Sequence, residues 1–261
     1  MVSAEYVNWV RRAEVDVVAP LLRPGASILE IGGGTGQQAL DLSNLGFEVT
    51  SIDLPASTYS EARIFPIIEY DGKTIPFEDA SFDIVFSSNT LEHVRDLEPL
   101  HREFRRVLKP GGYCVHVLPT GAWRFWTMVS GFPEGARRLA GSRSRADFRR
   151  ALGACKEALL PARHGERGNA FSELWLFRPA WWRRHFESNG FTVTVDRPVG
   201  FLYTGHELFG TSWPADLRRR LGGVLGSSTH IFVLHPRPDV QTTASRTQAA
   251  GSSGPISRGK N

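Results

Sequence analysis

The chain has 261 residues, a formal net charge of +4 and a hydrophobic content of 41%, which is ordinary for a globular protein. This length suits one α/β domain with an added segment. No apolar run approaches the ~18 residues of a membrane span, and the first residues lack the apolar core of a signal peptide, so we expect a cytoplasmic protein. The two cysteines, Cys114 and Cys155, match no metal-binding spacing and are expected to be free thiols.

The positive charge is concentrated in two segments. Residues 121–175 carry a net charge of +5 and residues 237–261 carry +3, so the rest of the chain is at −4. The basic excess therefore does not belong to the main part of the domain. In the first segment it would suit an anionic substrate or an anionic membrane surface, or it is simply a solvated surface.

Apolar runs and turn signals predict the secondary structure in chain order. Helices are expected at residues 4–20, 37–45, 97–108 and 179–189. Strands are expected at residues 27–31, 48–52, 66–70, 83–87, 113–118, 191–196 and 229–234. Strands that alternate with helices in this way predict a Rossmann-like, doubly wound α/β fold with a mainly parallel seven-stranded sheet and helices on both faces.

This alternation breaks after the fifth strand. Residues 121–175 are expected to form a helical insertion that caps the substrate side of a domain spanning residues 1–235. Residues 236–261 are rich in Ser, Thr, Ala and Gly and contain no aromatic residue, so they are predicted to be a disordered tail.

The most informative motif is ILEIGGGTG, residues 28–36, followed one strand later by Asp53. A strand, a glycine-rich turn, a helix and a second strand that ends in a carboxylate form a nucleotide-binding unit. A dinucleotide site requires G-x-G-x-x-G, and the position of its last glycine is occupied here by Gln37. Glu30 before the turn would repel a pyrophosphate but suits a cationic amino-acid cofactor.

Residues Glu30 to Gly36 resemble motif I, E/D-x-G-x-G-x-G, of the class I S-adenosylmethionine (SAM)-dependent methyltransferases. Residues 76–94 and 103–112 resemble further segments of the small-molecule methyltransferases in that family. The resemblance covers about residues 25–120 and implies SAM as the cofactor. It implies these cofactor-binding residues: Glu30, Gly32, Gly34, Gly36, Asp53, Leu54, Asp71, Gly72, Ser88 and Asn89.

The same resemblance implies individual roles for some of these residues. Asp53 resembles the acid that binds both ribose hydroxyls, and a carboxylate can bind two vicinal hydroxyls through its two oxygens. Asp71 resembles the acid that takes the adenine amino group, and Leu54 would pack on the adenine face. Ser88 and Asn89 follow the fourth strand, at the carboxyl edge of the sheet where such folds bind ligands.

His93 is a first candidate for chemistry on the acceptor. With Glu92 it resembles the E-x-x-E-H segment of ubiquinone-biosynthesis O-methyltransferases, which can bind a divalent metal. Asn89 replaces the first acid, and two remaining ligands make a poor site, so no metal is predicted. His93 either takes part in catalysis or orients the segment after the fourth strand.

The segment RHGERGN, residues 163–169, is a second candidate. His164 is the expected general base, and Glu166 is expected to orient it or to hold a substrate hydroxyl. The alternative is an exposed charged loop. His206 and Glu207 are weaker candidates.

Aromatic residues crowd the segment GAWRFWTMVSGF, residues 121–132. They could form a wall that stacks on a sugar or a helix at a membrane interface. The simpler interpretation is that they pack the insertion onto the sheet, because aromatic clusters usually belong to a core.

These features together predict a SAM-dependent methyltransferase that acts on a small molecule, at a hydroxyl oxygen of a sugar, glycolipid or secondary metabolite. The alternatives are a nucleotide-cofactor oxidoreductase and a non-catalytic SAM-binding module. Methylation of nucleic-acid amino groups is disfavoured, because the sequence after the fourth strand lacks an N/D-P-P-Y/F motif.

Overall fold

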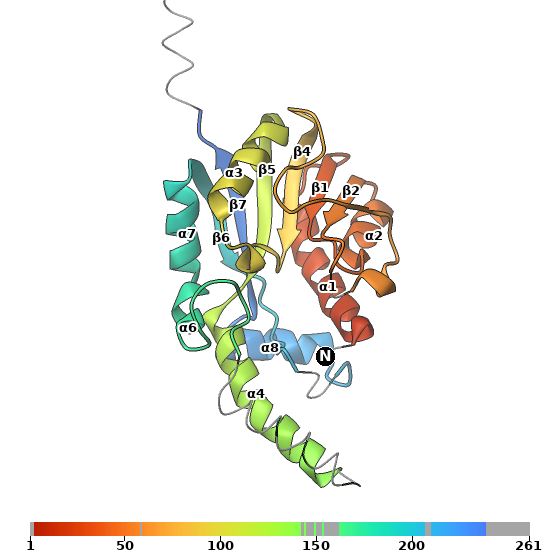
Figure 1. Ribbon diagram of the computed structural model, residues 1–261, viewed down its shortest axis with the longest axis vertical. Coiled ribbons are helices and arrows are strands. Elements are labelled where there is room, and N and C mark those ends of the chain that lie inside the picture. Colours follow the sequence, from red (N-terminus) through yellow and green to blue (C-terminus); the bar gives the residue numbers. More distant parts are fainter. Residues whose placement is uncertain are drawn as a thin grey trace, which may run out of the picture.

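The computed structural model describes residues 3–57, 59–141, 144, 149, 153, 162–206 and 210–238. One seven-stranded sheet has the order β3-β2-β1-β4-β5-β7-β6 (Figure 1). Its strands are β1 (Ser27–Ile31), β2 (Glu48–Asp53), β3 (Ile67–Glu69), β4 (Phe82–Ser88), β5 (Leu108–Pro119), β6 (Phe191–Pro198) and β7 (Thr229–Pro236). Only β7 runs antiparallel to its neighbours in this sheet, so the mainly parallel α/β fold expected from the sequence is confirmed.

Helices connect and flank the strands. They are α1 (Ala4–Val18), α2 (Gln37–Asn44), α3 (Leu97–Val107), α4 (Gly121–Ala140), α6 (Glu173–Leu176), α7 (Pro179–Ser188) and α8 (Ala215–Leu225), with the short 3₁₀ helices η1 (Ala19–Leu21), η2 (Ser60–Ala62) and η3 (Leu91–His93). The helical insertion after the fifth strand is present as α4 and α6, whereas α8 was not predicted. None of the helices in the described part of the chain combines the length and apolarity needed to cross a membrane.

The helix α3 shows how the sequence produces these elements. Leu97, Leu100, Phe104 and Val107 recur at helical spacing and are all buried, while arginines occupy the other side. An apolar stripe of this kind must pack against another element to leave water. Here the stripe covers one face of the sheet together with Trp182 and Phe186 of α7.

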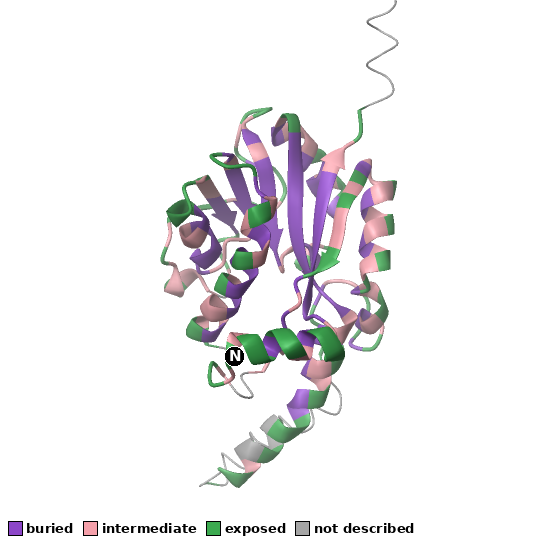
Figure 2. Ribbon diagram, turned by 180° about the vertical axis from the view of Figure 1, so that it is seen from behind, coloured by how far each residue is buried: buried purple, intermediate pink, exposed green. Residues whose placement is uncertain are grey.

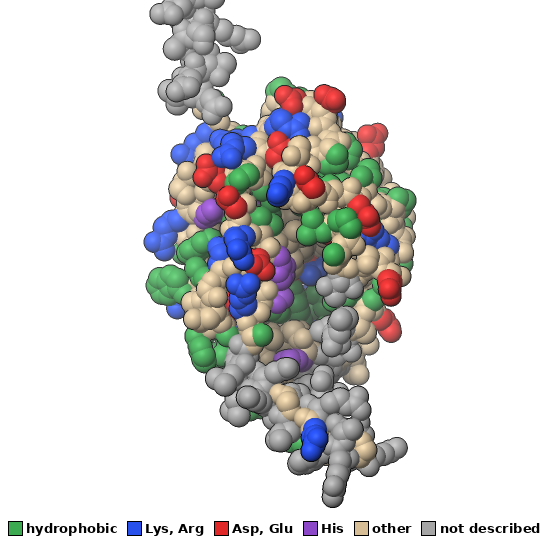
Figure 3. Space-filling model, viewed as in Figure 1, with side chains coloured by type: hydrophobic (Ala, Val, Ile, Leu, Met, Phe, Trp, Pro, Cys, Tyr) green, Lys and Arg blue, Asp and Glu red, His purple; other side chains and the backbone are tan. Residues whose placement is uncertain are grey.

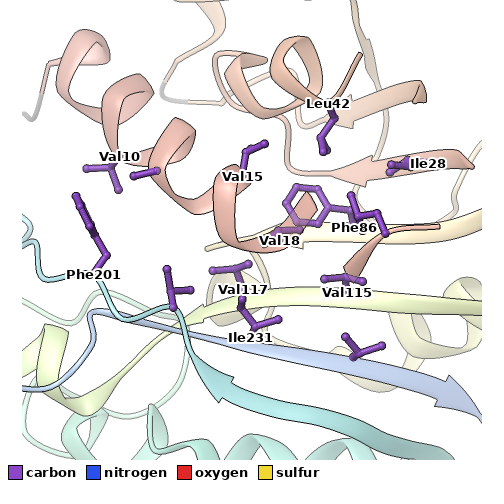
Figure 4. Close-up of a cluster of buried hydrophobic side chains, with 14 of the residues drawn as sticks. Val10, Val15, Val18, Ile28, Leu42, Phe86, Val115, Val117, Phe201 and Ile231 are labelled. Atoms are coloured by element: carbon purple, nitrogen blue, oxygen red, sulfur yellow. The ribbon is translucent and has the colours of Figure 1, made fainter. Parts of the chain in front are cut away.

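The opposite face of the sheet is covered by α1 and α2. Val10, Val15 and Val18 of α1 belong to a buried cluster with Phe86 and Val117 of the sheet (Figure 4). Each face therefore has its own core, and the central strands are buried on both sides (Figure 2). Such strands become nearly continuous apolar runs, as the sequence of β4 shows.

The predicted boundaries agree with the structure to within two residues except at the start of the fifth strand. The fifth strand begins at Leu108 instead of residue 113, because Leu108 pairs with Phe82 and Tyr113 pairs with Ile84; four residues of β5 thus lie opposite one residue of β4, as an irregularity in the register. The last strand continues to Pro236, and residues 239–261 of the predicted tail lie outside the described residues. Cys114 is a buried free thiol, and Cys155 also lies outside the described residues.

The insertion lies at one end of the sheet. The helices α4, α6 and α8 lie beyond the carboxyl ends of the parallel strands (Figure 1), and most of α8 is exposed (Figure 2). The loops that follow β1, β2 and β4 emerge at the same edge. This edge is where parallel α/β sheets bind their ligands.

Candidate active site

The glycine-rich turn between β1 and α2 depends on two glycines in different ways. Gly32 has a φ of +78°, and a Cβ there would lie 2.4 Å from the Thr90 hydroxyl oxygen. Gly34 has a φ of +58°, and a Cβ there would meet no atom within 4 Å. The positive φ favours glycine at both positions, and the close contact with Thr90 leaves no room for a side chain at Gly32. Gly32 thus lets the turn pack on the chain after β4, and Gly34 leaves open space above the turn.

Asp53 at the end of β2 faces this turn. Its carboxylate accepts hydrogen bonds from the backbone N–H of Gly34 at 2.9 Å and from that of Leu54 at 2.8 Å. The carboxylate is therefore fixed beside the open space at Gly34, where vicinal hydroxyls of a ligand could reach it.

Glu30 lies beneath the turn. It is buried, and the Ser51 hydroxyl donates a hydrogen bond to it at 2.6 Å. Burial raises the pKa of Glu30 to about 7, and the nearby charge of Asp53 adds to the effect. Near neutral pH this carboxyl therefore has a large protonated fraction.

An exposed apolar surface lies beside Asp53. The Leu54 side chain is 46% exposed, and a Cβ on Gly72 would lie 2.8 Å from it, so the two residues are adjacent. Asp71 accepts hydrogen bonds from the backbone N–H groups of Lys73 and Thr74, which lower its pKa. Leu54, Asp71 and Gly72, which are predicted to contact adenine, are thus neighbours in the structure.

A cavity of about 380 Å³ opens at the carboxyl edge of the sheet. Figure 3 shows the hollow in this face of the molecule, with histidine side chains beside it. The cavity is lined by Tyr6, Val7, Val10, Arg11, Tyr59, Asn89, His93, Trp123, Arg124, Thr127, His164, Tyr203, Thr204 and Gly205. The lining thus combines α1, the chain after β4, the insertion and the segment after β6.

Glu92, His93 and His164 form a cluster at this cavity. The Nε2 atom of His93 lies 3.8 Å from Glu92 Oε1, and the Nε2 atom of His164 lies 4.0 Å from the same oxygen. The two imidazole rings are edge to face, with centroids 4.7 Å apart. The fold therefore brings together two histidines that are far apart in the sequence, and adds a carboxylate to them.

Burial governs the protonation of this cluster. It raises the pKa of Glu92 to about 8, because a buried carboxylate is poorly solvated. It lowers the pKa of His164 to about 3, with the nearby charges of His93 and Arg124 adding to the effect, and it also lowers the pKa of His93. A neutral imidazole of this kind can accept a hydrogen bond from a hydroxyl but holds a proton only weakly.

Glu173 positions the loop that carries His164. Its carboxylate accepts hydrogen bonds from the backbone N–H of His164 at 2.6 Å and of Gly165 at 2.7 Å, and it pairs with Arg124 at 2.9 Å. Glu173 is fully buried. The sequence analysis did not single it out, although a lone acid in the apolar run FSELWLF was the available signal.

The other predicted acceptor residues lie in different surroundings. The carboxylate of Glu166 pairs with Arg163 at 3.2 Å and with Arg95 at 3.6 Å, while its backbone N–H donates to the Glu92 carbonyl at 2.9 Å. His206 directly follows Gly205, which lines the cavity, and Glu207 lies outside the described residues.

The aromatic segment 121–132 is divided between two environments. Trp123 is buried, lines the cavity and lies 4.5 Å from His164 between ring centroids. Phe125 and Phe132 are exposed on α4. The segment is therefore neither entirely a wall of the cavity nor entirely packed onto the sheet.

Glu14 of α1 links the helix to β4, to β7 and to the segment after β6. Its buried carboxylate accepts hydrogen bonds from Arg11, Ser88, Tyr203 and Thr229 at 2.7 to 3.2 Å. Three of these donors lie on the sheet or on the segments that follow its strands. Ser88, expected to bind the cofactor, is thus part of the network that fixes α1.

Comparison with known proteins gives a consistent picture. Residues 29–116 match a family described as "Methyltransferase domain". The chain is 34% identical over 93 residues to a demethylmenaquinone methyltransferase of Corynebacterium efficiens, which covers 35% of this chain and 40% of that protein. It is 31% identical over 102 residues to a sterol 24-C-methyltransferase of Gibberella zeae, which covers 35% and 27%. The chain thus spans less than half the length of either relative.

The fold has a counterpart among solved structures. A SAM-dependent methyltransferase from Methanosarcina mazei superposes with a TM-score of 0.52 and 18% identity, covering 85% of this chain and 98% of that one. This likeness extends well beyond the residues that the family comparison matches. It concerns the fold, since the sequence identity is low.

Proposed function

We propose that the protein is a class I SAM-dependent methyltransferase that methylates a hydroxyl oxygen of a small molecule held in the cavity; the match of residues 29–116 to a methyltransferase domain supports this proposal. The proposed acceptor is a sugar, a glycolipid or a secondary metabolite. One observation carries the proposal: the cavity beside the glycine-rich turn holds two neutral imidazoles, His93 and His164, that could accept a hydrogen bond from a hydroxyl, with the carboxyl group of Glu92 beside them.

The cofactor half of the site fits SAM. When bound, SAM supplies a methyl group on a sulfonium sulfur. We propose that Asp53 holds the ribose hydroxyls and that Leu54 and Gly72 flank the adenine. The remaining proposed cofactor residues are Glu30, Gly32, Gly34, Gly36, Asp71, Ser88 and Asn89. The open space at Gly34 and the fixed Asp53 carboxylate beside it support these roles.

The acceptor half has the size and composition of a small-molecule site. Its volume of about 380 Å³ falls within the ordinary range for ligand pockets. Trp123 and Tyr203 provide aromatic walls suited to a sugar ring or another cyclic acceptor. Methyl transfer is an in-line displacement, so holding the hydroxyl oxygen in place supplies much of the catalysis.

We propose that the insertion determines which acceptor molecule binds. His164, Trp123 and Arg124 all belong to residues 121–175, the cap of the domain proposed to span residues 1–235. On the outer side of α4, Phe125, Val129 and Phe132 are exposed at helical spacing. Such a stripe would suit the lipid portion of a glycolipid acceptor or a membrane surface.

Titration calorimetry with S-adenosylhomocysteine, and with NADH in parallel, tests the cofactor half of the proposal. Replacement of Asp53 by Asn should weaken S-adenosylhomocysteine binding by over ~1.5 kcal/mol, because charge-assisted hydrogen bonds are lost. Asp79→Asn is the matched control, since this exposed acid pairs with Arg106 on the surface.

The proposal predicts binding of S-adenosylhomocysteine to the unmodified chain and to Asp79→Asn, and no binding of NADH. Binding of NADH alone would favour the oxidoreductase alternative. Unchanged affinity in a folded Asp53→Asn variant would remove that residue from the site. Turnover in an acceptor screen that starts from sugars and glycolipids distinguishes an enzyme from a SAM-binding module.

A further inference from the structure

Glu92 is a buried carboxylate without a hydrogen-bond partner among the described residues. Its side chain is 0% exposed, and both carboxylate oxygens lack a donor. The nearby guanidinium groups are bonded elsewhere: Arg167 donates to the carbonyls of Leu91 and Val94, and Arg11 donates to Glu14. Buried polar atoms are nearly always hydrogen-bonded, and these two oxygens have no partner among the described residues, so the position suits a ligand that the described residues do not provide.

The two groups facing this carboxylate are imidazoles. One donor atom from each of Glu92, His93 and His164 can be chosen so that all three lie within 4.8 Å of one another. Two histidines and one carboxylate form the donor set of catalytic zinc sites and of other divalent transition-metal sites. Donors on one zinc ion lie ~3.3 Å apart in a tetrahedral site with bonds of ~2.0 Å.

The side chains have room to reach this geometry. His93 is 45% exposed and His164 is 34% exposed, and both line the cavity, so rotation of the two rings can shorten the distances of 3.8 and 4.0 Å. Glu92 closes the buried side of the cluster. A metal held here would therefore keep an open position toward the cavity.

Contacts between two segments of the chain hold His164, the donor from the insertion, beside Glu92 and His93. Hydrogen bonds from Glu166 N to the Glu92 carbonyl and from Arg167 to the Leu91 and Val94 carbonyls join the His164 loop to η3. A Cβ on Gly165 would lie 2.8 Å from the Glu92 carbonyl oxygen, so the two segments are in close contact. The insertion thus supplies the ligand that Asn89 does not, from a different part of the chain.

We propose that Glu92, His93 and His164 bind a divalent transition-metal ion of the zinc class, with the acceptor hydroxyl as a further ligand. The role of the ion in catalysis rests on the proposed function, whereas the binding of the ion does not. The ion would act as a Lewis acid on the hydroxyl. The O–H proton passes to water, the oxygen bonds to the methyl carbon, and the carbon–sulfur bond breaks with its electron pair on sulfur. The products are the methyl ether, S-adenosylhomocysteine and one proton.

The test uses the untagged full chain after treatment with a chelator. Titration with Co²⁺, followed by visible absorption, should give one ion per chain, and Zn²⁺ should displace it. His164→Gln and His93→Gln should each weaken Co²⁺ binding more than about 100-fold, since even supporting residues around a metal change affinity 10–100-fold. His235→Gln is the matched control, because His235 lies near the carboxyl end of β7, where it stacks on Tyr113 of β5 and does not line the cavity.

Titration of each variant with S-adenosylhomocysteine separates the two hypotheses. Chelator-treated chain that binds S-adenosylhomocysteine but no Co²⁺, or equal Co²⁺ affinity in all three variants, overturns the metal site and leaves the proposed function standing. Failure to bind S-adenosylhomocysteine counts against the proposed function alone. Circular dichroism checks folding; His164→Gln keeps the hydrogen bonds to Glu173, which come from backbone N–H groups.

Discussion

Glu30 is a carboxyl group that the fold buries beneath the glycine-rich turn. Burial raises its pKa from 4.5 to about 7. The folded state therefore binds the proton more tightly than the unfolded state does. The stabilisation from this proton is complete below pH 4.5 and is lost as the pH rises to about 7.

Replacing Glu30 by Gln removes this titration while keeping the shape of the side chain. Between pH 4 and pH 8, the free energy of unfolding of the unmodified protein should fall by about 3 kcal/mol relative to that of Glu30→Gln. Urea denaturation of both proteins at the two pH values measures the difference. A difference that does not change with pH would show that Glu30 has an ordinary pKa in the folded chain.

Among the elements, α1 combines an apolar face with one buried acid. Its apolar residues pack on the sheet, and Glu14 accepts hydrogen bonds from Arg11, Ser88, Tyr203 and Thr229. The last three donors come from distant parts of the chain. The helix is thereby held at the position where it forms one wall of the cavity.

Substitution of Glu14 by Gln should lower the free energy of unfolding by about 3 kcal/mol, because Arg11 would remain near the network without its counter-charge. Glu98→Gln is the control: Glu98 pairs with Arg102 on the surface of α3, and its loss should cost less than ~0.5 kcal/mol. Urea denaturation at neutral pH compares the two. Equal costs would mean that Glu14 contributes no more than a surface charge.

Local signals explain which elements could be predicted. The strand at 27–31 and the start of the following helix at Gln37 agree with the predictions, because an apolar run and a glycine turn define both. The helix α8 was missed because ADLRRRLGGVL contains three arginines and two glycines. The cluster at the cavity was missed because the loop that carries His164 comes to His93 only through its hydrogen bonds to Glu173 and to the Glu92 carbonyl, which no local pattern encodes.

At the scale of the whole molecule, the proposed cofactor contacts come from the carboxyl ends of β1 to β4 and the segments that follow these strands. A ligand that binds there only in the folded chain stabilises the entire fold. At a free concentration 100 times its Kd, S-adenosylhomocysteine should add about 2.7 kcal/mol to the free energy of unfolding. Thermal unfolding with and without the ligand measures this effect.

The same measurement has two controls. NADH should leave the midpoint temperature unchanged, and Asp53→Asn should respond to S-adenosylhomocysteine only at higher concentration. A midpoint that does not move at saturating ligand would contradict a cofactor site built from these segments.

The cavity is assembled from stretches that lie mostly outside the matched residues 29–116. Of its lining residues, only Tyr59, Asn89 and His93 fall inside that range. Under the proposed function, the residues proposed to bind the cofactor and most of those that line the acceptor cavity thus lie in separate parts of the sequence. Substitutions at Val7, Thr127 or Thr204 can alter which molecule is accepted while the strand–turn–helix unit stays untouched. Such a division would let acceptor selectivity change while the residues proposed to bind the cofactor stay the same.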